Sequence, residues 1–289
     1  MNKKVVTGVL LTAVLGASMF GVGVYMGNES YEKVNVPNSE TVISENVIEK
    51  NNDMNTNKEI PAFENIDIRV MSGDVTIEIG EEYSLGYYLH GREKVKRFEV
   101  VDNTLYFDTG FDTKYKAEYG DWKVVITVPS TAVLKDINIK TAAGDIVISD
   151  KVFSEGNFET VSGVIELSGI TAKELDMKAV SDEIEVKDSR INEIEAETVS
   201  GEIKINGEFE EVEMKSVSGD ISVSGKLTVA DIENVSGDVD IDADISSVDA
   251  KTVGGRITIN GENQGKKINI AGENPFAKIK TISGDITIR

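Results

Sequence analysis

The chain has 289 residues, no cysteine, one histidine and a net charge of −21. A surface this acidic repels DNA, RNA and anionic lipid headgroups, so we expect no nucleic-acid binding. The absence of cysteine excludes a disulfide framework, a thiolate metal site and a catalytic thiol. One histidine leaves little material for a zinc site or a Ser-His relay.

Residues 1–26 predict a cytoplasmic tip followed by a single transmembrane helix. An apolar run covers residues 5–26 after Lys3 and Lys4, and as a helix it would span about 33 Å, which matches a bilayer core. The two lysines should stay in the cytoplasm, which predicts a single-pass protein of the cell membrane with the rest of the chain outside. A cleaved signal peptide is the alternative, because residues 16–18 form a weak cleavage site.

Two segments precede the main repeats. Residues 27–61 are polar, rich in Asn, Glu, Ser and Thr, and show no sustained periodicity, which predicts a flexible linker. In residues 62–130 apolar and polar side chains alternate, for example around Ile66 and Val75, and this period of two is typical of β-strands. We interpret residues 62–130 as a β meander that forms an N-terminal cap.

A repeated block, T-V-S-G-D-I-x-I, carries most of the information in residues 131–289. From Gly144 onward its central position recurs at steps of 19, 19, 19, 18, 18, 18 and 29 residues. A near-constant step of this size is too short for a pair of helices and suits one coil of a β-solenoid. The central positions are Gly73 in an early copy, then Gly144, Gly163, Asp182, Gly201, Gly219, Gly237, Gly255 and Gly284.

The aliphatic positions within each coil predict a stacked core. Ile203 and Ile221 are equivalent residues of successive coils, and such side chains should point inward and lie about 4.8 Å apart. The central glycine permits a backbone bend that is closed to residues with a Cβ. Three positions before it a small polar residue recurs, and this ladder could face inward or outward: Thr160, Thr198, Ser216, Asn234 and Thr252.

The Val-Ser-Gly-Asp-Ile blocks, in the region from Phe63 to Arg289, resemble the adhesin domain of bacterial membrane proteins known as domain-of-unknown-function family 4097. The resemblance implies a β-strand repeat domain anchored by one N-terminal helix, with a link to envelope-stress systems in some members. The family has no assigned catalytic residues, so none is transferred to this chain. Arg256 departs from the pattern, because Asp or Glu usually occupies its position.

The residues that follow the central glycines form an acidic ridge: Asp145, Glu183, Glu202, Asp220, Asp238 and Asp285. Clustered carboxylates could bind calcium. However, Val164 and Arg256 interrupt the ridge, and the chain lacks the paired-glycine pattern of calcium-binding solenoids. We interpret the ridge as solvated turn residues that bond their own backbone.

An enzyme is not expected. Paired carboxylates can cleave sugars, but the coils are nearly uniform and do not supply the long loops that build a cleft. His90 beside Tyr87 and Tyr88 fits a strand better than a catalytic base. We therefore predict no catalytic, cofactor-binding or metal-binding residue and no cofactor.

The sequence thus predicts an all-β protein: a parallel β-solenoid of 18–19-residue coils, preceded by a β meander and a single N-terminal transmembrane helix. The expected function is an adhesin, or a structural or binding module of the bacterial cell envelope. Its partners would be an envelope polymer or a membrane or surface protein. The alternative is a regulatory protein of an envelope-stress response that acts through a membrane partner.

The last strand, at residues 285–288, is expected to leave the C-terminal end of the solenoid open. An open end exposes unpaired backbone groups, which natural solenoids usually cover. We expect the cover to be a second copy in a homo-oligomer, a partner protein or the long last repeat folded back. Lys278, Lys280 and Arg289 should lie near this edge and keep it soluble.

Overall fold

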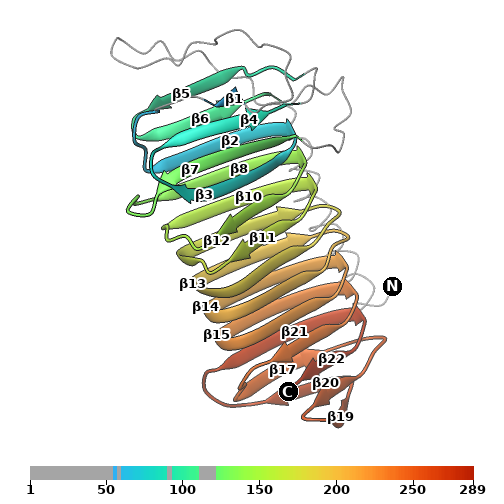
Figure 1. The fold of residues 1–289 in the computed structure, drawn as a ribbon. Coiled ribbons are helices and arrows are strands. Elements are labelled where there is room, and N and C mark those ends of the chain that lie inside the picture. The colour runs from blue at the N-terminus through green and yellow to red at the C-terminus, as the bar shows by residue number, and fades with distance from the viewer. Residues whose placement is uncertain (1–54, 57–59, 90–92, 111–121) are drawn as a thin grey trace.

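The computed structural model describes residues 55–56, 60–89, 93–110 and 122–289. These residues form an all-β column of stacked rungs, and most neighbouring strands run parallel (Figure 1). The all-β, largely parallel architecture that the repeat predicts is therefore confirmed. The predicted transmembrane helix, most of the predicted linker and His90 lie outside the described residues.

Each central rung contributes one strand to each of two layers. The long-strand layer contains β8 (Asp136–Ala143), β10 (Glu155–Ser162), β12 (Thr171–Ala179) and the second halves of β13 (Ile184–Thr198), β14 (Ile203–Ser218) and β15 (Ile221–Ser236). The short-strand layer contains β9 (Ile146–Ser149), β11 (Ile165–Ser168), the first halves of β13, β14 and β15, and β16 (Val239–Asp242). Within each layer the register advances by one repeat from rung to rung.

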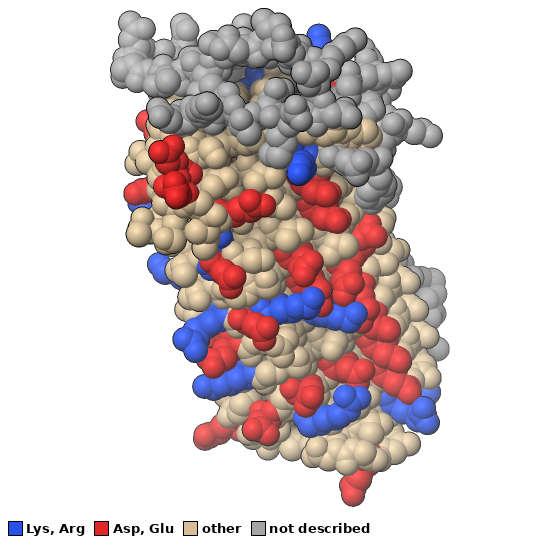
Figure 2. Space-filling model, viewed as in Figure 1, with Lys and Arg blue, Asp and Glu red and all other residues tan. Residues whose placement is uncertain are grey.

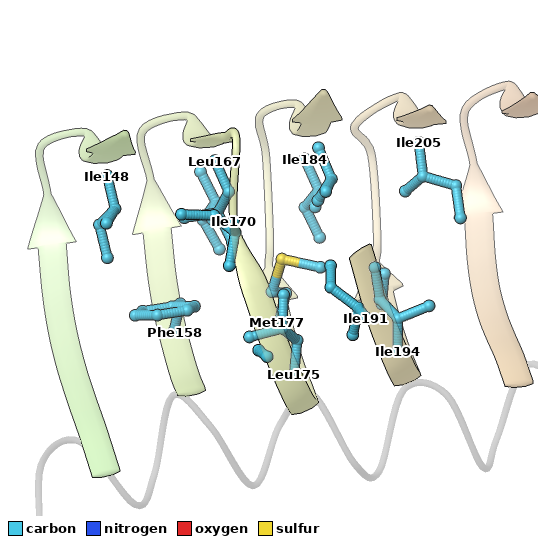
Figure 3. Packing of buried hydrophobic residues seen from close by; sticks show 14 of the residues in the cluster. Ile148, Phe158, Leu167, Ile170, Leu175, Met177, Ile184, Ile191, Ile194 and Ile205 are labelled. Carbon is cyan, nitrogen blue, oxygen red and sulfur yellow. The ribbon is translucent and has the colours of Figure 1, made fainter. Parts of the chain in front are cut away.

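The core lies between the two layers. Ile203 pairs with Ile221, which pairs with Val239, and these side chains are 0%, 1% and 0% exposed. Figure 3 shows how buried residues such as Leu167 and Phe158 fill the space between the strands of the two layers. The predicted inward register is confirmed.

The small polar ladder also faces inward. Thr160, Thr198, Ser216 and Asn234 are all 0% exposed. Several of these side chains bond the corner backbone: Asn234 Nδ2 donates to the Gly219 carbonyl at 2.9 Å, and Thr198 Oγ1 accepts from the Gly201 N–H at 3.0 Å. The inward direction, which the sequence pattern left undecided, thus lets some ladder residues satisfy backbone groups where their rungs turn, whereas Ser216 Oγ is buried without a hydrogen-bond partner among the described residues.

At the N-terminal end the predicted β meander is wrong. β2 (Asn65–Ser72) lies between β6 (Thr104–Asp108) and β8, and β3 (Asp74–Gly80) lies between β7 (Lys123–Pro129) and β9, all in parallel. Among the described residues of 62–130, β4 (Ser84–Tyr88) and β5 (Arg97–Val101) are the strands that run antiparallel, on β7 and β6. The alternation of apolar residues is the same in both kinds of strand, so it did not reveal the direction of pairing.

Order begins before the predicted boundary of this region. β1 (Asn55–Thr56) pairs antiparallel with β4 inside the segment predicted as a linker. Ile60 is buried in the core at 6% exposure. Within the described ranges no helix has the length and apolarity needed to cross a membrane.

The C-terminal end also departs from sequence order, and the predicted open final strand is wrong. β21 (Phe276–Ser283) is inserted between β15 and β17 (Ser247–Lys251), and β22 (Ile286–Ile288) between β16 and β18 (Ile257–Ile259). The outermost strands are β19 (Glu262–Gly265) on β18 and β20 (Lys267–Ile270) on β17, both antiparallel. The long last repeat thus folds back and covers its own end, which confirms one of the three covers that the sequence predicted.

The basic residues of this region hold the inserted rung in place. Lys278 contacts Asp231, Lys280 lies 2.6 Å from Glu233, and Arg289 lies 3.4 Å from Asp240. Each cation on β21 or after β22 therefore meets a carboxylate of the preceding rung. The prediction that these residues lie at an exposed edge and keep it soluble is therefore wrong. Their ion pairs instead join an internal rung to its neighbour in register.

Hydrogen exchange should report the insertion directly. We expect the amides of Ile286 and Ile288 to exchange as slowly as those of β16, because β22 is bonded on both sides. The outer strands β19 and β20 should exchange much faster, since each pairs on one side within the described chain. Amide exchange followed by NMR or mass spectrometry would test this, and fast exchange in β22 would contradict the inserted arrangement.

Candidate functional site

At every corner but that of Asp182, a glycine occupies the central position of the rung, and it touches the corner of the neighbouring rung. A Cβ placed on Gly219 would lie 1.9 Å from the carbonyl oxygen of Gly201, and one on Gly201 would lie 1.8 Å from that of Asp182. Contacts this short are sterically forbidden. Close backbone approach is thus the reason for glycine at these two corners, and at Gly144 and Gly237 a positive φ of 153° and 140° adds to it.

The acidic ridge is part of the same corner. Asp220 Oδ1 accepts from the backbone N–H of Asp238 at 2.8 Å, and Asp238 Oδ1 accepts from that of Asp285 at 2.7 Å. These aspartates therefore bond the backbone of the next rung, whereas the ridge residues Glu183 and Glu202 lie 3.0 and 2.8 Å from Lys204 Nζ. The interpretation that ridge residues bond their own backbone is wrong for these aspartates, because sequence reasoning considered one turn at a time and the N–H donor is supplied by the adjacent rung.

The two interruptions of the ridge preserve this bonding. The Val164 N–H donates to Asp145 Oδ1 at 2.8 Å. A valine can make this bond because the donor is its backbone and not its side chain. Arg256 lies on the rung beyond Asp285, donates its backbone N–H to Asp285 Oδ1 at 2.8 Å and places its guanidinium 3.0 Å from Oδ2. These two bonds lower the pKa of the Asp285 carboxyl. Arg256 is thus the cationic end of the ridge.

Asp182, which replaces the central glycine once, supplies a substitute acceptor. In four rungs the central N–H donates to a carbonyl of the next rung, as Gly219 does to Ser236 at 3.0 Å, and in two others it donates to a threonine Oγ1 of its own rung. The Gly163 N–H instead donates to Asp182 Oδ2 at 2.9 Å. The Asp182 side chain therefore takes the place of a main-chain carbonyl at this corner.

A second row on the outer side of the long-strand layer alternates in charge, and we call it the charge column. Its members occupy equivalent positions of successive rungs: Lys140, Glu159, Lys178, Glu197, Lys215, Glu233 and Lys280. Lys140 lies 3.0 Å from Glu159, and Lys215 lies 3.3 Å from Glu197. Sequence reasoning missed this column, although opposite charges at steps of 18 or 19 residues were a readable signal.

Lys215 is the centre of the densest charge cluster. Its ammonium lies 2.5 Å from Glu213, 3.3 Å from Glu197 and 3.4 Å from Glu195. Burial lowers the pKa of Lys215, but the hydrogen bond to Glu213 and the attraction of Glu197 outweigh it, and the net shift is upward. Burial also raises the pKa of Glu195, against the effect of Lys215.

Replacing Lys215 with methionine should lower the free energy of unfolding by about 1–2 kcal/mol at pH 7. The three glutamates would then face one another without an ammonium, and the pKa of Glu195 in the folded state, which burial already raises, would rise further above that of the unfolded chain. Stability of the variant is therefore lost as pH rises through that window, and the difference from the wild type should shrink as pH falls towards about 4.

Urea unfolding at several pH values would measure this loss. Lys226→Met, at an exposed position, is the control and should change stability by less than about 0.5 kcal/mol. A loss at Lys215 that does not depend on pH would mean that lost packing of the lysine stem, and not charge, explains it.

A third row on the same surface consists of exposed carboxylates. It runs through five successive rungs: Asp136, Glu155, Glu174, Glu193 and Glu211. Figure 2 shows acidic side chains along the length of one face, with basic side chains between them. In the described part of the chain no group of three or more His, Asp or Glu residues is placed to hold a metal ion. The arrangement offers repeated rows of charge rather than groups that converge on one point.

Known proteins share this architecture. A family model described as Toastrack DUF4097 matches residues 63–289. A putative adhesin from Bacteroides fragilis is 16% identical and superposes with a TM-score of 0.53, covering 84% of this chain and 100% of its own. A putative adhesin from Parabacteroides merdae is 15% identical with a TM-score of 0.41, covering 83% and 97%.

A putative lipid binding protein from Parabacteroides distasonis is 16% identical with a TM-score of 0.45, covering 83% of this chain and 98% of its own. At these identities a structural likeness shows the fold alone. No curated protein matches the chain in sequence. The family match spans most of the chain, and the stacked rungs with glycine corners account for it physically: this chain belongs to the Toastrack DUF4097 family.

Proposed function

We propose that the chain is a membrane-anchored binding module on the outside of a bacterial cell, similar in role to an adhesin, and that it is not an enzyme. The observation that carries this proposal is that many of its polar side chains form bonds between rungs and do not converge on one site. Ridge carboxylates such as Asp220 and Asp238 bond the next rung, and charge-column residues such as Lys140 pair along the column. What faces solvent is a long repeated surface, which suits binding an extended partner.

The fold comparison supports the same role. The Bacteroides fragilis protein described as a putative adhesin is covered over its entire length. The apolar run of residues 5–26 behind Lys3 and Lys4 supports an anchor with the N-terminus in the cytoplasm and the column outside. An envelope polymer or a surface protein would then be the partner.

Labelling of single cysteines in intact cells tests the location, since the natural chain has no cysteine to interfere. Thr228→Cys, at an exposed position of β15, should react with a membrane-impermeant maleimide. Asn2→Cys is the matched control and should react only after lysis. Protection of Thr228→Cys in intact cells would contradict the extracytoplasmic location.

Crosslinking tests the binding role. A photoreactive residue at position 228 in intact cells should trap an envelope polymer or a surface protein in a discrete adduct. Loss of adhesion when the gene is deleted, restored by the full chain, would support the adhesin role. Capture of only a signalling membrane protein, with adhesion unchanged, would replace it with a regulatory role.

A further inference from the structure

The outer side of the long-strand layer carries one apolar row among its charged rows, and we call it the valine column. It consists of the residue two positions before the central position in eight successive rungs: Ala142, Val161, Val180, Val199, Val217, Val235, Ile282 and Val253. Seven of these side chains are half-buried, and Val253 at the outer end is 54% exposed. The column is therefore open to solvent along its length.

The direction of these side chains follows from their neighbours. Thr198, Ser216 and Asn234 immediately precede column members and are fully buried, so by strand alternation the following valines point outward. Other outward positions on this layer hold mainly Lys, Glu and Asp. An aliphatic residue at the same outward position of rung after rung therefore runs against the polar pattern of this surface.

The flanks of the valine column restrict its partner. On one side lies the charge column, in which four lysines alternate with three glutamates, and beyond it a row that contains Glu195 and Glu213. On the other side, around the corner of each rung, lies the acidic ridge, three residues further along the chain. The ridge and the outer row give this surface an excess of carboxylates, so it complements a partner with an apolar stripe and basic side chains, and it repels anionic lipid.

A second copy of this chain complements the surface poorly. If two columns packed face to face with their axes antiparallel about the centre of the row, Glu195 of one copy would oppose Glu213 of the other in the row beside the charge column. In the charge column Glu197 would meet Lys215, but these two side chains already form an ion pair within one copy. Carboxylates directly opposite each other are destabilising, and the net charge of −21 adds to the repulsion.

The length and spacing of the column favour a helix. Eight rungs at about 4.8 Å span about 34 Å, the length of a helix of about 23 residues. The apolar stripe of an amphipathic helix repeats about every 5.4 Å, close to the rung spacing. An extended strand along the same axis would present one side chain about every 6.6 Å and would lose register with the rungs.

We propose that the valine column is the docking line for a basic amphipathic helix of a partner protein, lying along the column axis. This inference rests on the proposed function as a binding module and names the chemistry of its partner. The helix would place its apolar stripe on Val180, Val199 and Val217 and its Lys or Arg side chains over the flanking carboxylates. Recognition of this kind combines apolar anchors with charged flanks.

The test uses the full chain in zwitterionic nanodiscs and a labelled synthetic peptide of about 21 residues with leucines on one helical stripe and lysines on both flanks. A scrambled peptide of the same composition, without the stripe, is the control. Fluorescence anisotropy should give a dissociation constant at least about tenfold lower for the striped peptide. Equal affinity of the two peptides would overturn the proposal.

Two column variants separate apolar docking from simple charge attraction. Val199→Asp with Val217→Asp should weaken binding of the striped peptide by about tenfold or more, although the added negative charge would strengthen purely electrostatic binding. Val147→Asp, at a half-buried outward position of β9 in the other layer, is the matched control and should leave the affinity unchanged. Unchanged or tighter binding by the double Asp variant would reject the docking line.

A loss of affinity can be attributed to the valine column only if the variants fold like the natural chain. Circular dichroism should show an unchanged melting profile, and Val199→Thr with Val217→Thr, which keeps the side-chain shape, provides a milder second test with a smaller loss of affinity. Failure of the peptide experiment together with outside labelling of Thr228→Cys would reject this inference alone. Protection of Thr228→Cys inside intact cells would reject the proposed function itself.

Discussion

Replacing Gly219 with alanine is expected to lower the free energy of unfolding by about 3 kcal/mol. The new Cβ would lie 1.9 Å from the Gly201 carbonyl oxygen, so the two rungs must separate at the corner. The Gly219 N–H donates to Ser236 on the other side at 3.0 Å, so movement in either direction weakens a rung-to-rung hydrogen bond. Urea unfolding followed by circular dichroism would measure the loss.

Gly254→Ala is the matched control for this prediction. Gly254 lies next to the corner of the outer rung, and its added Cβ would be 3.3 Å from the Ile282 carbonyl oxygen, a contact that a small shift relieves. We expect a change of less than about 1 kcal/mol. Similar losses at both positions would mean that general glycine effects, and not contact between rungs, explain the result.

Replacing Ile221 with aspartate should be at least as damaging, with an expected loss of about 4 kcal/mol or more. Ile221 is 1% exposed and stacks between Ile203 and Val239. A carboxylate there has no cation and no water within the core, and each neighbouring rung loses an apolar contact. Thermal and urea unfolding of the purified variant would measure the effect.

The adjacent residue gives a sharp comparison. Ser222 is half-buried on the outer side and pairs with Lys204 on one rung and Asp240 on the next. An aspartate there meets one favourable and one unfavourable neighbour, so Ser222→Asp should change stability by less than about 0.5 kcal/mol. Equal effects at Ile221 and Ser222 would contradict the inward register.

The order of the rungs explains how both ends of the column are protected. In a simple stack the first and last repeats would each be held by one neighbour and would fray first. Here β2 is bonded to β6 and β8, and β21 is bonded to β15 and β17. The antiparallel strands β4, β5, β19 and β20 then cover the outermost rungs. Each end is therefore closed by segments of the domain itself.

The repeat in the amino-acid sequence determined the class of fold and the content of each rung. Its constant step indicated which residues stack, and its alternation indicated that Ile203 and Ile221 point into the core. These features are local, because a strand of period two and a glycine corner depend on residues within one repeat and its copy. The same reasoning recognised Gly73 as an early copy of the corner.

The tertiary structure alone decided the order of the end rungs and the partners of the polar side chains. Insertion of β21 beside β15 joins residues 47 positions apart, such as Asp231 and Lys278, and no constant step predicts such a pairing. The Asp238 carboxylate bonds Asp285 across the same gap. Strand alternation is identical whichever neighbour a strand meets, so only the assembled column, with its charges and backbone donors in place, selects one arrangement.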